Sequence, residues 1–190
     1  PPGIPKDSSQ RNFTDPESRV MKTTEGFQQC YNAQIAVDAD CQVIVSRTVT
    51  NCAADVGELT PLVRSIKENT GRQAKEISAD AGYCSETNLK ELSRRGIRGY
   101  VATTKHRKAL KDQSKGNKHG PRASAMRRRL RQGGPQSRYR LRKQTVEPVF
   151  GHIKEARGFR RFLLRGLTNV QKEFDMLCTA HNLLKLFAGA

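Results

Sequence analysis

The chain has 190 residues and a formal net charge of +17, from 35 Lys and Arg residues against 18 Asp and Glu residues. That length is enough for one domain with a hydrophobic core, or for one domain with an insertion. The sequence contains no apolar run long enough to span a membrane and no signal peptide. Its five cysteines include no C-x-x-C pair, which indicates a reducing compartment and argues against a disulfide framework or a zinc knuckle.

Most of the charge lies in one segment, residues 105–143, which holds fifteen of the Lys and Arg residues and a single acid. Such a block is typical of an arm that binds phosphate groups, and we expect Arg127, Arg128 and Arg129 to contact nucleic acid. The alternative is a solvated linker. We therefore predict a basic insertion over residues 105–138, whose composition favours disorder when free, with a short helix over about residues 123–131. An anionic membrane surface is a weaker alternative, because no amphipathic apolar stripe accompanies the charges.

The N-terminal part of the chain predicts a linker followed by a β-hairpin. Residues 1–26 are rich in proline and polar side chains and are expected to be the linker. Residues 31–38 and 42–50 alternate apolar and polar side chains, which is the period of a strand, and a short turn after Asp38 separates them. We expect them to pair as a hairpin, within the first part of a core that covers residues 27–104.

A helix is expected to begin at Asp55, because Glu58 three residues later completes an acidic variant of the capping box. Four apolar residues at helical spacing give it a buried stripe, and Gly71 should end it. Short strands are then expected at residues 74–79 and 99–102, on either side of a second helix. This order of strands and helices predicts an α/β fold, with a mixed sheet flanked by helices.

The second helix should be capped by Ser85. After the basic segment, residues 139–190 are expected to contain helices, separated by a stretch of aromatic, apolar and basic residues at 158–166. The last helix, over about residues 168–187, has an apolar face that includes His181 and Leu184, and His181 is interpreted as a core or boundary residue.

Glu147 is the one carboxylate in a strongly cationic stretch. Lys143 precedes it by four residues and Lys154 follows by seven, which brings the three side chains close to one face of a helix. The common interpretation is a surface salt bridge; the alternative is a metal-binding carboxylate on a face that also binds phosphate. Pro148 must either kink this helix, freeing the Gln144 carbonyl, or sit in the first turn of a new helix.

Asp80 is the second candidate carboxylate. It follows a predicted strand, at the end where the active-site residues of open α/β sheets collect, although aspartate is also a common turn residue. Together with Glu147 it could hold hard divalent cations such as Mg²⁺ through oxygen ligands. Two such ions can promote phosphodiester cleavage, and the surrounding Lys and Arg residues would offset phosphate charge.

Several stretches resemble the DDE transposases of bacterial insertion sequences, in the branch that has a signature of tyrosine, basic residue, glutamate and lysine. The signature residues here are Tyr139, Lys143, Glu147 and Lys154. The resemblance covers nearly the whole chain. It includes Asn12-Phe-Thr-Asp-Pro-Glu-Ser-Arg19, Tyr31-Asn-Ala-Gln34, Ala79-Asp80-Ala-Gly-Tyr83, Lys143-Gln-Thr-Val-Glu-Pro-Val-Phe-Gly151, Arg157-Gly-Phe-Arg-Arg-Phe162 and His181-Asn-Leu-Leu-Lys185.

This resemblance implies a ribonuclease H-like fold and metal-dependent cleavage and strand transfer at transposon ends. It implies that Asp80 and Glu147 bind two Mg²⁺ or Mn²⁺ ions and that Lys154 is catalytic. DNA is the implied partner, bound by a homo-oligomer in the bacterial cytoplasm, at the nucleoid. The expected DNA contacts, besides the three arginines of the basic segment, are Tyr139, Lys143, Arg160, Arg161 and Arg165.

The chain departs from the family pattern in three ways. Lys143 stands where arginine is usual, and its distance from Tyr139 is one residue longer than in the commonest form. The first catalytic aspartate usually lies on the first strand, often as Asp-Gly-Thr, and the sequence contains no Asp-Gly-Thr. Asp15 and Asp38 are possible substitutes. The favoured expectation is that this strand and its acid lie upstream of Pro1 and that the chain is the carboxyl part of a transposase.

Two other functions remain as alternatives. The chain could be a nucleic-acid-binding protein whose acids are structural, or a stand-alone nuclease. Binding without metal-dependent turnover would select the former, and hydrolysis without strand joining would select the latter.

Overall fold

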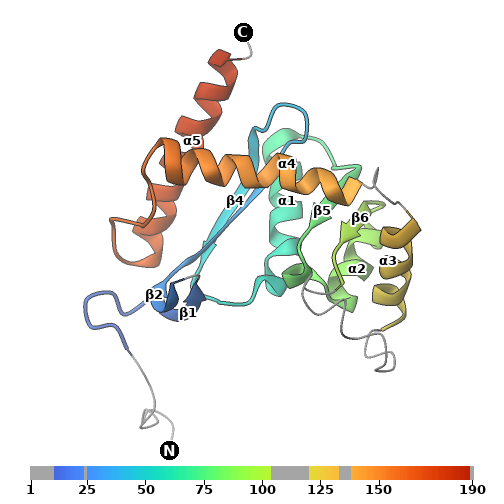
Figure 1. The fold of residues 1–190 in the computed structure, drawn as a ribbon, viewed down its shortest axis with the longest axis horizontal. Coiled ribbons are helices and arrows are strands. Elements are labelled where there is room, and N and C mark those ends of the chain that lie inside the picture. Colours follow the sequence, from blue (N-terminus) through green and yellow to red (C-terminus); the bar gives the residue numbers. More distant parts are fainter. Residues whose placement is uncertain (1–10, 24, 104–119, 133–137, 189–190) are drawn as a thin grey trace, which may run out of the picture.

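The computed structural model describes residues 11–23, 25–103, 120–132 and 138–188, apart from the side chains of residues 138 and 140–143. Residues 32–101 follow the predicted order of strand, strand, helix, strand, helix and strand, and the fold class is α/β (Figure 1). The strands are β1 Arg19–Thr23, β2 Gly26–Cys30, β3 Asn32–Val37, β4 Ile44–Thr50, β5 Glu76–Ala79 and β6 Arg98–Val101. The α-helices are α1 Leu59–Thr70, α2 Glu86–Arg94, α3 Pro121–Gln132, α4 Arg138–Gly151 and α5 Leu167–Ala188.

The strands form three separate two-stranded sheets in the part of the chain that the structure describes. β3 and β4 are the predicted antiparallel hairpin, in which Ala33 pairs with Val49 and Ile35 with Arg47. β5 and β6 are parallel, whereas β1 and β2 form a second antiparallel pair. The described strands therefore do not join into the single mixed sheet that we expected. Among them, β3 pairs only with β4 and β5 only with β6, so each has one edge without a strand partner.

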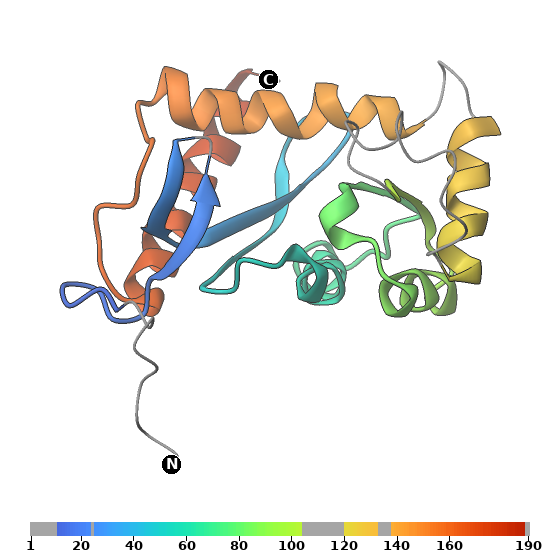
Figure 2. The ribbon, with the colours of Figure 1, turned by 60° about the horizontal axis from the view of Figure 1, so that its bottom comes forward.

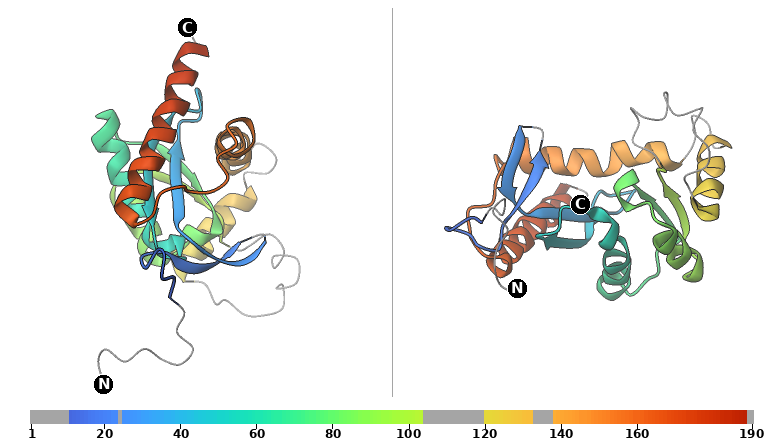
Figure 3. Two further views of the ribbon diagram at one scale, coloured as in Figure 1. Left: turned by 90° about the vertical axis from the view of Figure 1, so that its left-hand side faces the viewer. Right: turned by 90° about the horizontal axis from the view of Figure 1, so that it is seen from below.

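Two hydrophobic clusters hold these elements together. The first packs β5 and β6 against α1, α2 and α3, through Leu59, Val63, Ala79, Leu89, Leu92, Ile97, Val101, Ala123 and Met126. The second packs β3 and β4 against α4 and α5, through Ile35, Ile44, Val49, Val149, Ile153, Val170, Phe174 and Cys178. α4 reaches both groups of strands, because it contacts β3 as well as β5 and β6 (Figure 2). α1 and α4 lie on opposite sides of the β3–β4 hairpin (Figure 3).

The predicted linker, residues 1–26, contains packed structure in its described part. Strand β1 begins at Arg19, and Asp15 in the turn before it is buried. The Tyr31 hydroxyl donates a hydrogen bond to Asp15 Oδ1 at 2.7 Å, and the Gly166 backbone N–H donates to the same oxygen at 3.2 Å. This carboxylate thus joins the N-terminal turn to Tyr31, between β2 and β3, and to the segment before α5.

The end of α1 and the start of α2 have the predicted capping residues, whereas the start of α1 differs from the prediction. Gly71 ends α1 in the left-handed conformation at φ 67°, and the Ser85 hydroxyl caps α2 by accepting the Asn88 N–H at 3.0 Å. The predicted capping box at the start of α1 is wrong. A 3₁₀ turn, Asp55–Gly57, precedes the helix, and Glu58 stands at its N-cap without a side-chain cap bond.

α4 continues through Pro148 and leads into a π-helical turn, His152–Ala156. Proline has no N–H to donate to the carbonyl of Gln144, one turn earlier. The side-chain amide of Gln42, in the turn between β3 and β4, donates to that carbonyl at 2.9 Å. Of the two outcomes expected at Pro148, the structure has the proline within the helix, and a tertiary contact satisfies the freed carbonyl.

The last helix, α5, is anchored to the hairpin by His181, which is fully buried (0% exposed). Its Nε2 atom lies 3.0 Å from the Gln42 carbonyl oxygen, and its Nδ1 atom lies 3.3 Å from Arg157 Nη1. Burial lowers the pKa of His181 and so favours the neutral ring. The core interpretation of His181 is confirmed. Leu184, predicted on the same buried face, is instead 56% exposed, since the C-terminal end of α5 extends beyond the strands (Figure 1).

Candidate functional site

Asp80 lies at the carboxyl end of β5, in the predicted place. It is exposed and leads into a 3₁₀ turn, Ala81–Tyr83, whose first backbone bond joins the Tyr83 N–H to the Asp80 carbonyl at 3.1 Å. Helix α4, which carries Glu147, contacts both β5 and β6. The fold therefore packs α4, which carries Glu147, against β5, the strand that ends at Asp80.

Glu147 is exposed on α4, beside Val149, which is buried in the second cluster and holds the helix on the hairpin. Lys154 is exposed too, and its Nζ atom lies 5.8 Å from the centroid of the Phe150 ring. Lys154 belongs to the π-helical turn, so its angular offset from Glu147 differs from that of a regular α-helix. Tyr139 is half-buried on α4, and the side chain of Lys143 lies outside the described atoms.

Asp55 is a further carboxylate beside the turn that follows Asp80, and it was not among the predicted site residues. Its Oδ1 atom accepts hydrogen bonds from the side-chain amides of Asn32, at 2.8 Å, and Gln34, at 2.9 Å. Its Oδ2 atom faces the turn after Asp80, where a Cβ built on Gly82 would lie 2.5 Å from it. The sequence signal was the alternation of Asn32 and Gln34 on one face of a strand, which places two amides side by side.

The surroundings of Tyr83 show that acidic side chains gather here. Burial raises the pKa of the Tyr83 phenol, and the negative charges of Asp55, Asp80 and Glu58 raise it further. Burial and the charge of Asp55 likewise raise the pKa of Glu58. Asp80 and Glu147 are hard oxygen donors of the kind that Mg²⁺ and Mn²⁺ prefer. In the described part of the chain, no group of three or more His, Cys, Asp or Glu side chains is arranged to hold a metal ion.

The two acids considered as substitutes for the first catalytic aspartate have structural partners. Asp15 is buried between Tyr31 and Gly166, as described above. Asp38 Oδ2 accepts the backbone N–H groups of Asp40, at 3.1 Å, and Cys41, at 2.8 Å, and so closes the turn between β3 and β4. Each carboxylate is thus engaged in holding the local backbone.

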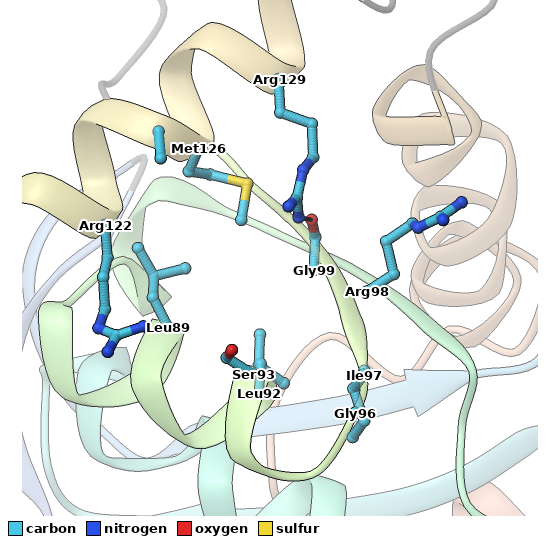
Figure 4. A pocket seen from close by; sticks show the side chains of 11 residues that line it. Leu89, Leu92, Ser93, Gly96, Ile97, Arg98, Gly99, Arg122, Met126 and Arg129 are labelled. Atoms are coloured by element: carbon cyan, nitrogen blue, oxygen red, sulfur yellow. Dashed lines mark hydrogen bonds between the residues drawn. The ribbon is translucent and has the colours of Figure 1, made fainter.

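Helix α3 is the described part of the basic insertion, and residues 104–119 and 133–137 lie outside the described residues. Arg128 and Arg129 are exposed and Arg127 is half-buried. A pocket of about 350 Å³ lies between α3, α2 and β6, with an apolar floor of Leu89, Leu92, Ile97 and Met126 (Figure 4). Three arginines line it, Arg98, Arg122 and Arg129, and Arg129 Nη1 donates to the Gly99 carbonyl at 3.3 Å.

The segment between the π-helical turn and α5 combines half-buried aromatic and exposed basic side chains. Phe159 and Phe162 stack edge to face at 5.7 Å and pack against the second cluster. Arg160, Arg161 and Arg165 are exposed, and Arg160 forms an ion pair with Glu155. The carboxylate of Glu173 accepts the backbone N–H groups of residues 163 and 164, which fixes this segment on α5. Three predicted DNA contacts are therefore presented to solvent from an anchored segment.

The fold combines an acidic cluster around Tyr83 with an arginine-rich helix, α3, that packs on α2 and β6, and clustered arginines on one helix are a feature of proteins that bind nucleic acid. A family model described as Transposase DDE domain matches residues 63–187, which is more than half of the chain. The chain belongs to the transposase DDE domain family. Transposition and recombination of DNA are the activities of that family, and DNA binding is implied with them.

Neither the curated proteins nor the solved structures gave a significant match. None of the described helices is both long and apolar enough to cross a membrane.

Proposed function

We propose that this chain is the core of an insertion-sequence transposase that cleaves phosphodiester bonds at transposon ends and transfers the strand to target DNA. One observation carries the proposal: α4, the helix of Glu147, packs on β5, the strand that ends at Asp80. The family match spans both residues. A shared site needs two carboxylates from separate elements on one side of the sheet, and this packing supports that arrangement.

Asp80 and Glu147 are the proposed ligands of two Mg²⁺ or Mn²⁺ ions, which would activate the attacking hydroxyl and stabilise the leaving oxygen when bound. The exposed ammonium group of Lys154 would contact a phosphate and place the strand. Lys143 and Tyr139 would extend this contact along α4. The arginines of α3 and of the segment before α5 would neutralise the phosphates on either side.

A third acid is proposed to come from a further strand that lies between β3 and β5, as in a ribonuclease H-like sheet. Both strands have an edge without a partner among the described residues, and α4 contacts both of them. Gln34 on β3 supports this position, because its side chain is 4% exposed and its Oε1 atom has no hydrogen-bond partner in the described structure. A backbone or side-chain donor on an added strand would satisfy it.

The experiment compares the 190-residue chain with a longer protein that includes a strand carrying the first aspartate. A labelled transposon-end duplex is scored for binding by gel shift and for nicking on a denaturing gel, with Mg²⁺ or Mn²⁺. The chain alone should bind DNA without nicking it, because one carboxylate of the site is missing. The longer protein should nick and join DNA. In it, Glu147→Gln should keep DNA affinity and lose cleavage, since the amide has nearly the same shape but no charge for the metal.

Other outcomes select other functions. Nicking by the chain alone would assign the third acid to Asp15 or Asp38, and the proposal of an added strand would then be wrong. Cleavage without joining by the longer protein would indicate a nuclease. DNA binding with no metal-dependent cleavage in either protein would favour a nucleic-acid-binding protein whose acids are structural.

A further inference from the structure

The turn that carries Asp80 is held by a side chain from a different sheet. Asp55 accepts two amide hydrogen bonds from Asn32 and Gln34, both on β3, and these fix the position of its carboxylate. Its other oxygen faces Gly82, two residues after Asp80. The β3–β4 and β5–β6 pairs share no hydrogen-bonded strands among the described residues, so this contact adds to the packing of α1 and α4 in joining the two pairs.

Gly82 is suited to this contact because it has no side chain. A Cβ there would lie 2.5 Å from Asp55 Oδ2, which is closer than Cβ atoms approach in folded proteins, and 3.3 Å from Asp55 Cβ, which is tighter than most such contacts. The turn can therefore rest directly on the Asp55 carboxylate. Two neutral amides therefore orient the Asp55 carboxylate, which lies against the backbone two residues after a candidate metal ligand.

We propose that Asp55 is a positioning residue, which holds the Asp80–Tyr83 turn against β3 and so sets the direction in which Asp80 presents its carboxylate. This inference rests on the proposed function, since it takes Asp80 to be a metal ligand. In this role Asp55 does not bind the metal itself but acts through Gly82. The role requires a side-chain oxygen that accepts from the two amides, and it does not require a negative charge.

The test measures Mn²⁺ affinity of the full chain by the loss of the free-ion paramagnetic resonance signal, a readout that needs no catalysis. Asp55→Ala removes the acceptor and the contact with Gly82, and should weaken Mn²⁺ binding about tenfold, the loss typical of outer-shell changes. Asp55→Asn keeps an oxygen that can accept from Asn32 and Gln34, and should stay within about threefold of the unchanged chain. Asp175→Asn is the matched control, since Asp175 of α5 forms an ion pair with Arg47 of β4 and is not among the proposed site residues.

Gly82→Ala provides a second variant that leaves Asp55 in place. Its methyl group should displace the turn from the carboxylate and weaken Mn²⁺ binding as Asp55→Ala does, with the far-ultraviolet circular dichroism spectrum unchanged. Unchanged Mn²⁺ affinity in Asp55→Ala and Gly82→Ala would overturn the positioning role. A loss in Asp55→Asn as large as that in Asp80→Asn would overturn it as well and make Asp55 a ligand. If Asp80→Asn itself has no effect, the proposed metal site fails, which is a separate result.

Discussion

Gln42 shows how single side chains replace missing backbone interactions. It has a left-handed backbone at φ 58°, which is uncommon for a residue other than glycine. From that position its side chain donates to the Gln144 carbonyl, at 2.9 Å, and accepts from Lys185 Nζ, at 2.7 Å, while its own carbonyl contacts His181. One turn residue thus joins the hairpin to both α4 and α5.

This geometry predicts an energetic coupling between Gln42 and Pro148. Gln42→Ala should lower the free energy of unfolding by about 1 kcal/mol, because the Gln144 carbonyl and the Lys185 ammonium each lose a partner. In a Pro148→Ala background the new N–H can donate to the Gln144 carbonyl, and Gln42→Ala should then cost less. Urea unfolding of the two single variants and the double variant gives the coupling energy. Equal costs of Gln42→Ala in both backgrounds would contradict this account.

At the scale of elements, helix α3 is attached to α2 through Glu86. The Glu86 carboxylate accepts the N–H groups of Arg122, at 3.2 Å, and Ala123, at 2.9 Å, in the first turn of α3. A carboxylate at a helix N-terminus both caps the free N–H groups and compensates the helix dipole. An acid on one helix therefore holds in place the helix that presents the arginines.

Glu86→Ala should loosen the first turn of α3, because two N–H groups lose their acceptor, with a cost of about 1 kcal/mol typical of a lost cap. Hydrogen exchange at residues 122 and 123 should speed up, while the amides of β5 and β6 keep their protection. Glu91→Ala is the control, since Glu91 pairs with Arg94 and Arg95 within α2. Unchanged exchange at residues 122 and 123 in Glu86→Ala would assign the capping of α3 to other groups.

At the scale of the whole molecule, charge is concentrated rather than spread. The formal net charge is +17, and most of it comes from residues 105–143. Arg122 and Arg129 of α3 line one pocket, and the arginines of residues 160–165 lie on a segment fixed to α5. Cations in such positions bind DNA mainly by displacing the counterions of its phosphates.

DNA affinity should therefore fall steeply with added salt. Changing Arg127, Arg128 and Arg129 to alanine should weaken binding, and the slope of log affinity against log salt should flatten by about 1 for each of these arginines that binds a phosphate. The matched control removes three charges elsewhere, with Arg64, Lys67 and Arg72 of α1 and the turn after it changed to alanine. Equal slopes for the two triple variants would show that net charge alone, rather than α3, determines the affinity.

The sequence by itself determined the features that depend on neighbours a few positions apart. Alternation predicted the hairpin of β3 and β4, Gly71 and Ser85 were identified as end signals, and the motif around Glu147 pointed to the family. The alternation of a strand, the caps of a helix and the residues of a turn each depend on side chains a few positions apart, so they can be recognised without knowing the fold.

Only the tertiary structure decided which side chains meet across the fold. Asp55 was expected to cap its own helix, but the amides of Asn32 and Gln34, more than twenty residues earlier, are its partners. The carbonyl freed by Pro148 is satisfied by Gln42, 102 residues away from Gln144. The strands also separate into three pairs, which their alternation does not reveal. Such contacts depend on how elements pack, and a side chain with several possible donors nearby bonds to those that packing brings within reach.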